Sequence, residues 1–184
     1  MAIRLTVKKA IGDYDPGASK FLGGPVMPEK LADSIQGEVI FLMQLRLSDI
    51  KDLDPENRLP HEGYLYVFLD VSNSEYSLVP IVKYTKQEPT HYITGFNEVV
   101  EGYEEFVDEY LIEFSPCDDL EGGNKLFGKP NDWNYVDEPR DLLLQFDPLD
   151  SEMGLFTHLD GLIYLFFGKD RKTFKDVTVM EEIS

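Results

Sequence analysis

The chain has 184 residues, and its 17 Lys and Arg against 35 Asp and Glu give a formal net charge of −18. Hydrophobic residues make up 42% and aromatic residues 12%, which is enough for a core and excludes a disordered chain. The single cysteine, Cys117, excludes an internal disulfide framework and a multi-thiolate zinc site. The longest apolar stretch, 162–167, is too short to cross a bilayer. We therefore expect a soluble, cytoplasmic protein without a membrane partner.

The negative charge predicts which partners the chain avoids. Nucleic acids are bound mainly through Lys and Arg, and the basic groups at 8–9 and 169–175 are too small for a binding stripe, so we expect no nucleic-acid partner. One interpretation of the charge is that it keeps the protein soluble. The other is an acidic surface that docks on a basic protein. If the chain has a macromolecular partner, we expect that partner to be basic.

Several segments have the pattern of β-strands. Residues 39–47 are apolar on both alternating faces, which predicts a strand covered on both sides. Residues 63–69 place Tyr and Phe on one face and Leu and Val on the other, and residues 161–167 follow a similar pattern. Further strands are predicted at 77–84 and 176–180. In the first strand, one predicted face holds Val39, Phe41, Met43 and Leu45, and the other holds Ile40 and Leu42.

The middle of the chain has an ambiguous pattern. Apolar residues between Phe96 and Glu109 recur at helical spacing, which predicts a helix or helical turn, and Tyr110–Phe114 alternates as a strand does. Polar stretches with Pro or Gly at 49–62, 115–123 and 146–160 are typical of loops.

Three segments recur in the same order along the chain. The matched ranges are 20–25 with 125–130, 42–45 with 143–146, and 63–68 with 161–166. Ordered matches predict duplicated halves, at about 19–85 and 124–184, within a single domain of residues 1–184. We expect an α+β fold, mostly antiparallel sheet, in which two repeated lobes are related by a pseudo-twofold axis around one core.

The same ordered motifs resemble a known family. Ser19-Lys20-Phe21-Leu22-Gly23-Gly24-Pro25, and Gly123-Asn124-Lys125-Leu126-Phe127-Gly128-Lys129-Pro130 in the second half, are similar to the YwqG-like family, a bacterial domain of unknown function. The resemblance runs from about Ser19 to the C-terminus and includes the paired strand motifs. It implies an α+β fold with internal duplication and no established activity. The chain departs from the family at 156–159, where a Trp-Gly-Asp-like turn is usual.

Four polar residues at equivalent places are candidate ligand-binding residues. Gln44 and Gln145 each interrupt an apolar strand, and a buried amide needs partners for two donors and an acceptor. Each amide either ties down a neighbouring loop, which is the more common arrangement, or faces a shared cleft between the lobes. Lys20 and Lys125 precede the two turns, where they either flank the same cleft and receive an anion or lie solvated over apolar surface.

Metal and cofactor sites have little support in the sequence. The run 52–57 resembles the start of a calcium loop, but Asn stands where Gly is needed, and Gly63 stands where a bidentate Glu belongs, so a solvated acidic loop is expected. His61 and His158 precede equivalent glycines and could approach each other, although a metal site there would need added carboxylates. We expect no cofactor.

These patterns indicate a binding function rather than catalysis. The sequence contains no recognisable nucleophile, metal frame or phosphate-binding loop, so we expect a non-enzymatic binding or protein-interaction module. One alternative is an acidic immunity- or antitoxin-like protein that binds a basic toxin. A second alternative is a hydrolase that uses carboxylates in the cleft between the lobes.

Overall fold

A computed structural model describes residues 1–72, 78–153, 159 and 161–182, and it is dominated by β-strands. The strands of the main sheet are β1 (Ala2–Lys9), β2 (Lys20–Phe21), β4 (Val39–Arg46), β5 (Tyr64–Asp70), β6 (Val79–Thr85), β8 (Tyr110–Cys117), β9 (Lys125–Leu126), β10 (Leu142–Phe146), β11 (Ile163–Phe166) and β12 (Thr178–Glu181). The other elements are β3 (Val26–Met27), β7 (His91–Tyr92), the helix α1 (Glu29–Ala32) and the 3₁₀ helices η1 (Leu47–Ile50) and η2 (Asn97–Val99). No helix in the described part of the chain is long and apolar enough to span a membrane.

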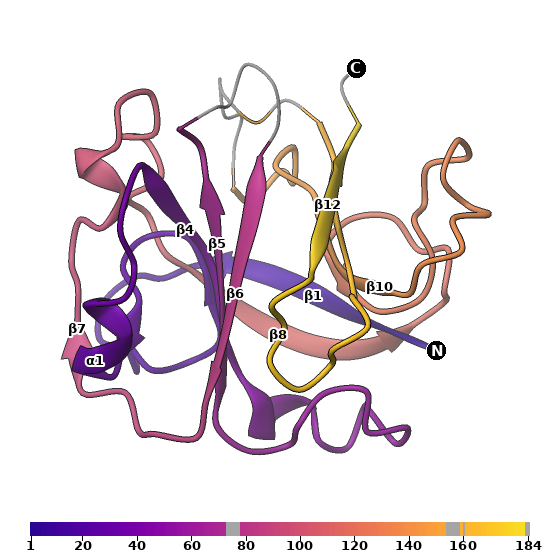
Figure 1. Ribbon diagram of the computed structural model, residues 1–184, viewed down its shortest axis with the longest axis horizontal. Coiled ribbons are helices and arrows are strands. Elements are labelled where there is room, and N and C mark those ends of the chain that lie inside the picture. The colour runs from indigo at the N-terminus through magenta and orange to yellow at the C-terminus, as the bar shows by residue number, and fades with distance from the viewer. Residues whose placement is uncertain (73–77, 154–158, 160, 183–184) are drawn as a thin grey trace.

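Ten strands form one antiparallel sheet that nearly closes into a barrel. The strand order is β12-β11-β10-β9-β1-β8-β2-β4-β5-β6, and the two end strands lie close to each other. Figure 1 shows β4, β5 and β6 side by side, with the long strands β1 and β8 crossing behind them. A separate pair, β3 and β7, lies outside this sheet.

The expected fold class, α+β with two repeated lobes, is wrong: this is a β-rich fold built on one barrel-like sheet. The physical reason is that strands from the two halves of the chain pair with each other at the centre of the sheet. β1 pairs with β8 over eight residues, β2 pairs with β8 as well as β4, and β9 pairs with β1 as well as β10. Because each half completes the other half's sheet, two separate lobes do not form.

The matched motifs nevertheless occupy equivalent places within this sheet. Gln44 is the cross-strand partner of Lys20, and Gln145 is the cross-strand partner of Lys125. The non-glycine residues after these lysines, Leu22 and Phe127, both have positive φ, at 58° and 64°. The central strands β1 and β8 also take equivalent places in the strand order. Both strands lie outside the predicted repeat halves, 19–85 and 124–184, and the limits of these halves stay a prediction.

Apolar residues lie on both faces of the sheet because both faces are covered. The interior core includes Leu65, Val67 and Leu69, while Tyr66 and Phe68 point outward into a second cluster covered by residues of α1 and of the segment around Phe96. The predicted faces of β5 and β11 are confirmed. In β4 the prediction is wrong after Phe41, because an irregularity between Phe41 and Met43 shifts the alternation and turns Met43 and Leu45 inward.

Of the helix or helical turn expected up to Glu109, the structure has only a helical turn. Only η2 is helical there, and the strand β8 begins at Tyr110 as predicted. The helical spacing has another origin: the N–H of Tyr103 bonds to the carbonyl of Val100, and the N–H of Phe106 bonds to the carbonyl of Tyr103. Successive tight turns of this kind bury every third residue, and that period imitates the apolar spacing of a helix.

Candidate functional site

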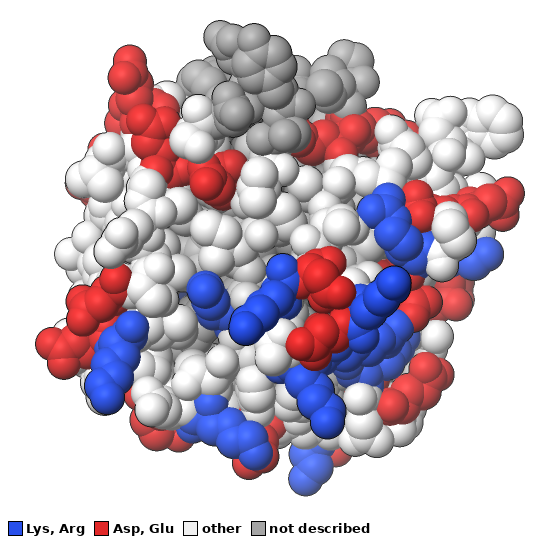
Figure 2. Space-filling view, in the orientation of Figure 1, with Lys and Arg blue, Asp and Glu red and all other residues white. Residues whose placement is uncertain are grey.

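A groove rich in positive charge opens between the loop before β5 and the loop that joins β11 to β12. Its volume is about 470 Å³, and a smaller pocket of about 200 Å³ shares Glu56, Arg58 and Arg171 with it. The groove is lined by Glu56, Asn57, Arg58, Leu59, Pro60, His61, Arg171 and Lys172. Figure 2 shows Lys and Arg side chains gathered on the lower half of this face, with a few acidic side chains among them. This concentration is unusual in a chain of net charge −18.

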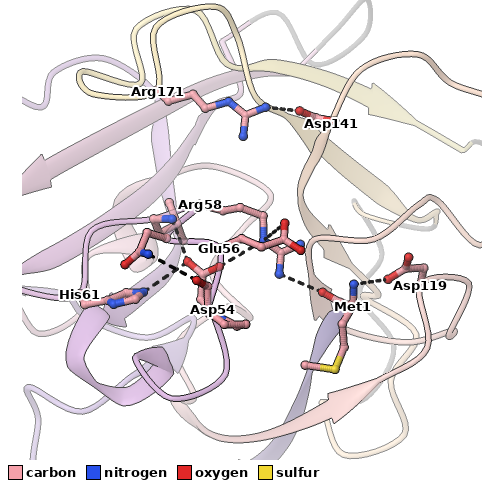
Figure 3. A network of polar contacts seen from close by, with 11 residues as sticks. Met1, Asp54, Glu56, Arg58, His61, Asp119, Asp141 and Arg171 are labelled. Carbon is pink, nitrogen blue, oxygen red and sulfur yellow. Dashed lines mark hydrogen bonds and ion pairs between the residues drawn. The ribbon is translucent and has the colours of Figure 1, made fainter.

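The buried carboxylate of Asp54 organises the first loop (Figure 3). It accepts hydrogen bonds from Arg58 Nε at 3.1 Å, from the Leu59 N–H at 3.0 Å and from His61 Nε2 at 3.4 Å. Burial alone would raise the pKa of Asp54, but these hydrogen bonds outweigh that effect and hold the pKa below its ordinary value. Because an ionised carboxylate can only accept, His61 donates through Nε2. The run 52–57 is solvated at Asp52, Glu56 and Asn57, as we expected, but Asp54 departs from that prediction because it is buried.

Two arginines flank the groove, and aromatic rings hold both in place. The Arg58 guanidinium lies 3.8 Å from the centre of the Phe127 ring and donates through Nη2 to the Met1 carbonyl at 2.9 Å. The Arg171 guanidinium lies 4.5 Å from the centre of the Phe167 ring and pairs with Asp141. Stacking fixes the plane of a guanidinium while leaving N–H groups at its rim for another acceptor.

The hydrogen-bond donors around the groove favour an anion. Arg58, Arg171 and Lys172 carry positive charge. Three carboxylates lie near them: Asp54 pairs with Arg58 at 3.1 Å, Glu56 lies 3.8 Å from Arg58, and Asp141 pairs with Arg171. Lys172 forms no ion pair with any described residue. Guanidinium groups bind carboxylate and phosphate through paired hydrogen bonds, so the donor set suits a ligand of that chemistry.

Sequence reasoning missed this site because its parts lie far apart along the chain. Arg58 and Arg171 are separated by more than a hundred residues, and the near-closure of the sheet brings their loops together. The one available signal was the basic group at 169–175, which supplies Arg171 and Lys172. That group alone is too small for a binding stripe, and Arg58 follows two acids, Asp54 and Glu56, within four residues.

The predicted glutamines are fully buried and bond to neighbouring loops. Gln44 Oε1 accepts from the Val26 N–H at 2.8 Å, and its Nε2 donates to the Ala18 carbonyl at 3.0 Å. Gln145 Oε1 accepts from the Asn131 N–H at 3.1 Å, and its Nε2 donates to the Gly123 carbonyl at 2.7 Å. Both amides therefore have the structural role that we considered the more common one.

The predicted lysines are buried too, and they have different partners. Lys20 Nζ lies 2.8 Å from Glu109 Oε2, and Glu109 also accepts from the hydroxyl groups of Tyr14 and Tyr92. Lys125 Nζ instead donates to the backbone carbonyls of Asp119 and Glu121, at 2.9 and 2.6 Å. Burial lowers the pKa of both lysines, and that of Lys125 falls to about 8.

The four predicted residues do not meet in one cleft. The structure brings them together only as two cross-strand pairs, Lys20 with Gln44 and Lys125 with Gln145. The strands β1 and β8 lie between β9 and β2, so three strand spacings, ~14 Å, separate the two lysine strands.

The predicted metal candidates give no metal centre in the described part of the chain. His61 belongs to the cationic groove, and His158 lies outside the described residues. Among the residues that the structure describes, no three or more His, Cys, Asp or Glu side chains are placed to hold a metal ion.

Comparisons with known proteins leave the family open. No family model matches the chain, and no curated protein matches it. The resemblance to the YwqG-like family therefore stays a prediction.

Proposed function

We propose that this protein is a non-enzymatic binding module that holds an anionic small molecule, of the phosphate or carboxylate class, in the groove between Arg58 and Arg171. The observation that carries the proposal is the placement of two ring-stacked guanidinium groups and Lys172 around one groove of about 470 Å³. Stacking pre-orders the arginines, so less side-chain entropy is lost when a ligand binds.

The loop that carries Arg58 is fixed before any ligand arrives. Asp54 holds both Arg58 and His61 through hydrogen bonds to one buried carboxylate. A site that is ordered in advance binds more tightly than one that must order on binding. His61 is 19% exposed and lines the groove.

Calorimetric titration tests this proposal directly. Inorganic phosphate, pyrophosphate and citrate are titrated at constant ionic strength into the wild-type chain and into the double variant Arg171→Gln/Lys172→Gln. We expect saturable binding of at least one anion, weakened about tenfold in the variant, because each lost cationic contact contributes roughly 0.5–1 kcal/mol. Arg4→Gln, which removes an arginine paired with Glu121, is the matched control and leaves binding unchanged. If all three anions fail to saturate, the proposal is wrong.

A basic protein partner stays a second prediction, supported by the segment 98–108. Glu98, Glu101 and Glu104 are exposed there, and Val99 is 87% exposed beside them. An acidic surface with an exposed apolar residue suits a cationic protein surface. Capture from a bacterial lysate at low and moderate salt tests this prediction. Recovery of only neutral or acidic proteins, independent of salt, would contradict it.

A further inference from the structure

The barrel-like sheet has a seam where its two end strands meet without pairing. β6 bonds to β5 and β12 bonds to β11, but no backbone hydrogen bond joins β6 to residues 172–182 among those that the structure describes. At one end of the seam, the Leu78 N–H donates to Glu181 Oε1 at 3.2 Å. Figure 1 shows β6 and β12 facing each other across this gap. The outer edge of β6 therefore keeps backbone donors and acceptors without strand partners.

The other end of the seam opens into a groove of its own. This groove has a volume of about 390 Å³ and runs between residues 80–84 of β6 and residues 172–175 of the following loop. The two segments run in opposite directions, because Leu78 lies at Glu181 while the later residues of β6 lie at 172–175. The groove thus follows the free edge of the strand.

Three lysines and no acidic residue line this groove. Lys83, Lys172 and Lys175 form no ion pair with any residue in the described part of the chain, whereas Lys9, for example, pairs with a carboxylate. In a chain of net charge −18, three unpaired lysines around one groove make a local positive field that attracts carboxylates.

A buried polar group next to the groove also lacks a partner. The Tyr84 hydroxyl is buried without a hydrogen bond to any described residue, and its ring packs at 6.3 Å from that of Phe174. A buried hydroxyl without a hydrogen-bond partner destabilises the fold. A strand inserted beside β6 would widen the seam and supply a donor or acceptor for this hydroxyl, and the lost stability would be recovered.

We propose that the seam between β6 and β12 accepts an extended acidic peptide, which adds a strand to the free edge of β6. The strand edge supplies the backbone hydrogen bonds that give affinity, and the lysines select Asp and Glu side chains. A second copy of the chain is disfavoured as the occupant, because two such edges would bring lysines together. This seam and the anion site between Arg58 and Arg171 share Lys172, but the edge of β6 lies outside the anion groove, so strand addition does not depend on the anion site.

The proposal is tested with three labelled ten-residue peptides in fluorescence anisotropy. The first peptide alternates Val and Glu, and the second alternates Val and Lys. The third has the sequence of the first, but every second backbone amide is N-methylated, so that the edge that would pair with β6 has no N–H donors. We expect the Val–Glu peptide to bind, the Val–Lys peptide not to bind, and the N-methylated peptide to bind at least about tenfold more weakly, because it retains the charges but loses backbone donors.

Protein variants separate charge from strand addition. Lys83→Gln/Lys175→Gln leaves Lys172 in place and is expected to weaken the Val–Glu peptide about tenfold, whereas the control Lys8→Gln/Lys30→Gln, at two exposed lysines elsewhere, leaves binding unchanged. Bound peptide should also slow hydrogen exchange of β6 amides. Absence of Val–Glu binding, equal binding of the N-methylated peptide, or equal loss in both lysine pairs would each overturn the proposal.

Discussion

Lys20 and Lys125 stand at equivalent places in the sheet, and the chain satisfies their buried charges in two different ways. Lys20 is fully buried with the carboxylate of Glu109, which is only 5% exposed, so opposite charges compensate each other. Among the described residues, Lys125 has the backbone carbonyls of Asp119 and Glu121, and no carboxylate, as hydrogen-bond acceptors. Burial without a carboxylate at bonding distance disfavours the ammonium form, and the pKa of Lys125 falls from 10.5 to about 8.

The lowered pKa of Lys125 predicts a specific pH dependence of stability. Between pH 8 and 10.5 the folded lysine is neutral while the unfolded lysine still binds a proton, so unfolding takes up a proton. The free energy of unfolding therefore rises with pH across this window because of Lys125, by at most about 1.4 kcal/mol per pH unit.

Urea denaturation of the wild-type chain and of Lys125→Met, measured from pH 7.5 to 10.5, checks this prediction. Burial raises the pKa of tyrosines such as Tyr110 in the folded state, and this adds the same pH dependence near pH 10 to both proteins, so the difference between the two proteins isolates the lysine. We expect wild type to gain stability relative to Lys125→Met as the pH rises. Parallel curves would mean that Lys125 stays charged in the folded state.

The residue directly before strand β5 is a glycine that no other residue can replace without moving the neighbouring strand. Gly63 has φ at +80°, and a Cβ built on it would lie 2.3 Å from the carbonyl oxygen of Thr85 at the end of β6. Gly12 has a nearly equal φ of +78°, but a Cβ there would have no atom within 4 Å. A side chain at either position would be strained by the positive φ, but only at Gly63 would its Cβ also collide with a neighbouring strand.

This pair of glycines gives a matched prediction for the β5–β6 hairpin. Gly12→Ala is expected to cost about 1–2 kcal/mol, the strain of an L-residue in the left-handed region. Gly63→Ala adds the displacement of a backbone carbonyl and is expected to cost about 1–3 kcal/mol more. Chemical denaturation measures both. Equal losses of stability in the two variants would contradict the prediction, because they would mean that a Cβ at Gly63 fits beside the Thr85 carbonyl without displacing it.

The sequence predicts the elements whose pattern arises from local contacts. β4, β5 and β11 are short apolar runs covered on both sides, and their positions are confirmed. β1 was missed although Ile3, Leu5 and Val7 alternate with polar residues, because its pairing with β8 is visible only in three dimensions. The cationic groove was missed for the same reason, since Arg58 and Arg171 meet only when the sheet curves back on itself.

At the scale of the whole molecule, the central strands bind the two halves of the chain together. Both sheet partners of β1, namely β8 and β9, belong to the second half of the chain, and both partners of β8, namely β1 and β2, belong to the region before Tyr110. The interior core likewise combines residues from both halves, such as Leu5 with Leu126 and Phe21 with Phe146, whose rings lie 5.1 Å apart. Neither half encloses a core alone.

Splitting the chain between Glu101 and Gly102 tests this interlocked arrangement. Fragment 1–101 retains β1 without either of its partners, and fragment 102–184 retains β8 without either of its partners, so both expose apolar core surface. We expect each fragment alone to lack a cooperative thermal transition in circular dichroism. An equimolar mixture should recover the β-sheet spectrum and a transition whose midpoint rises with concentration, as binding linkage requires. The intact chain is the control, and its midpoint stays independent of concentration. Cooperative unfolding of either fragment alone, at a midpoint unaffected by its partner, would mean that the halves are independent folding units joined only at their edges.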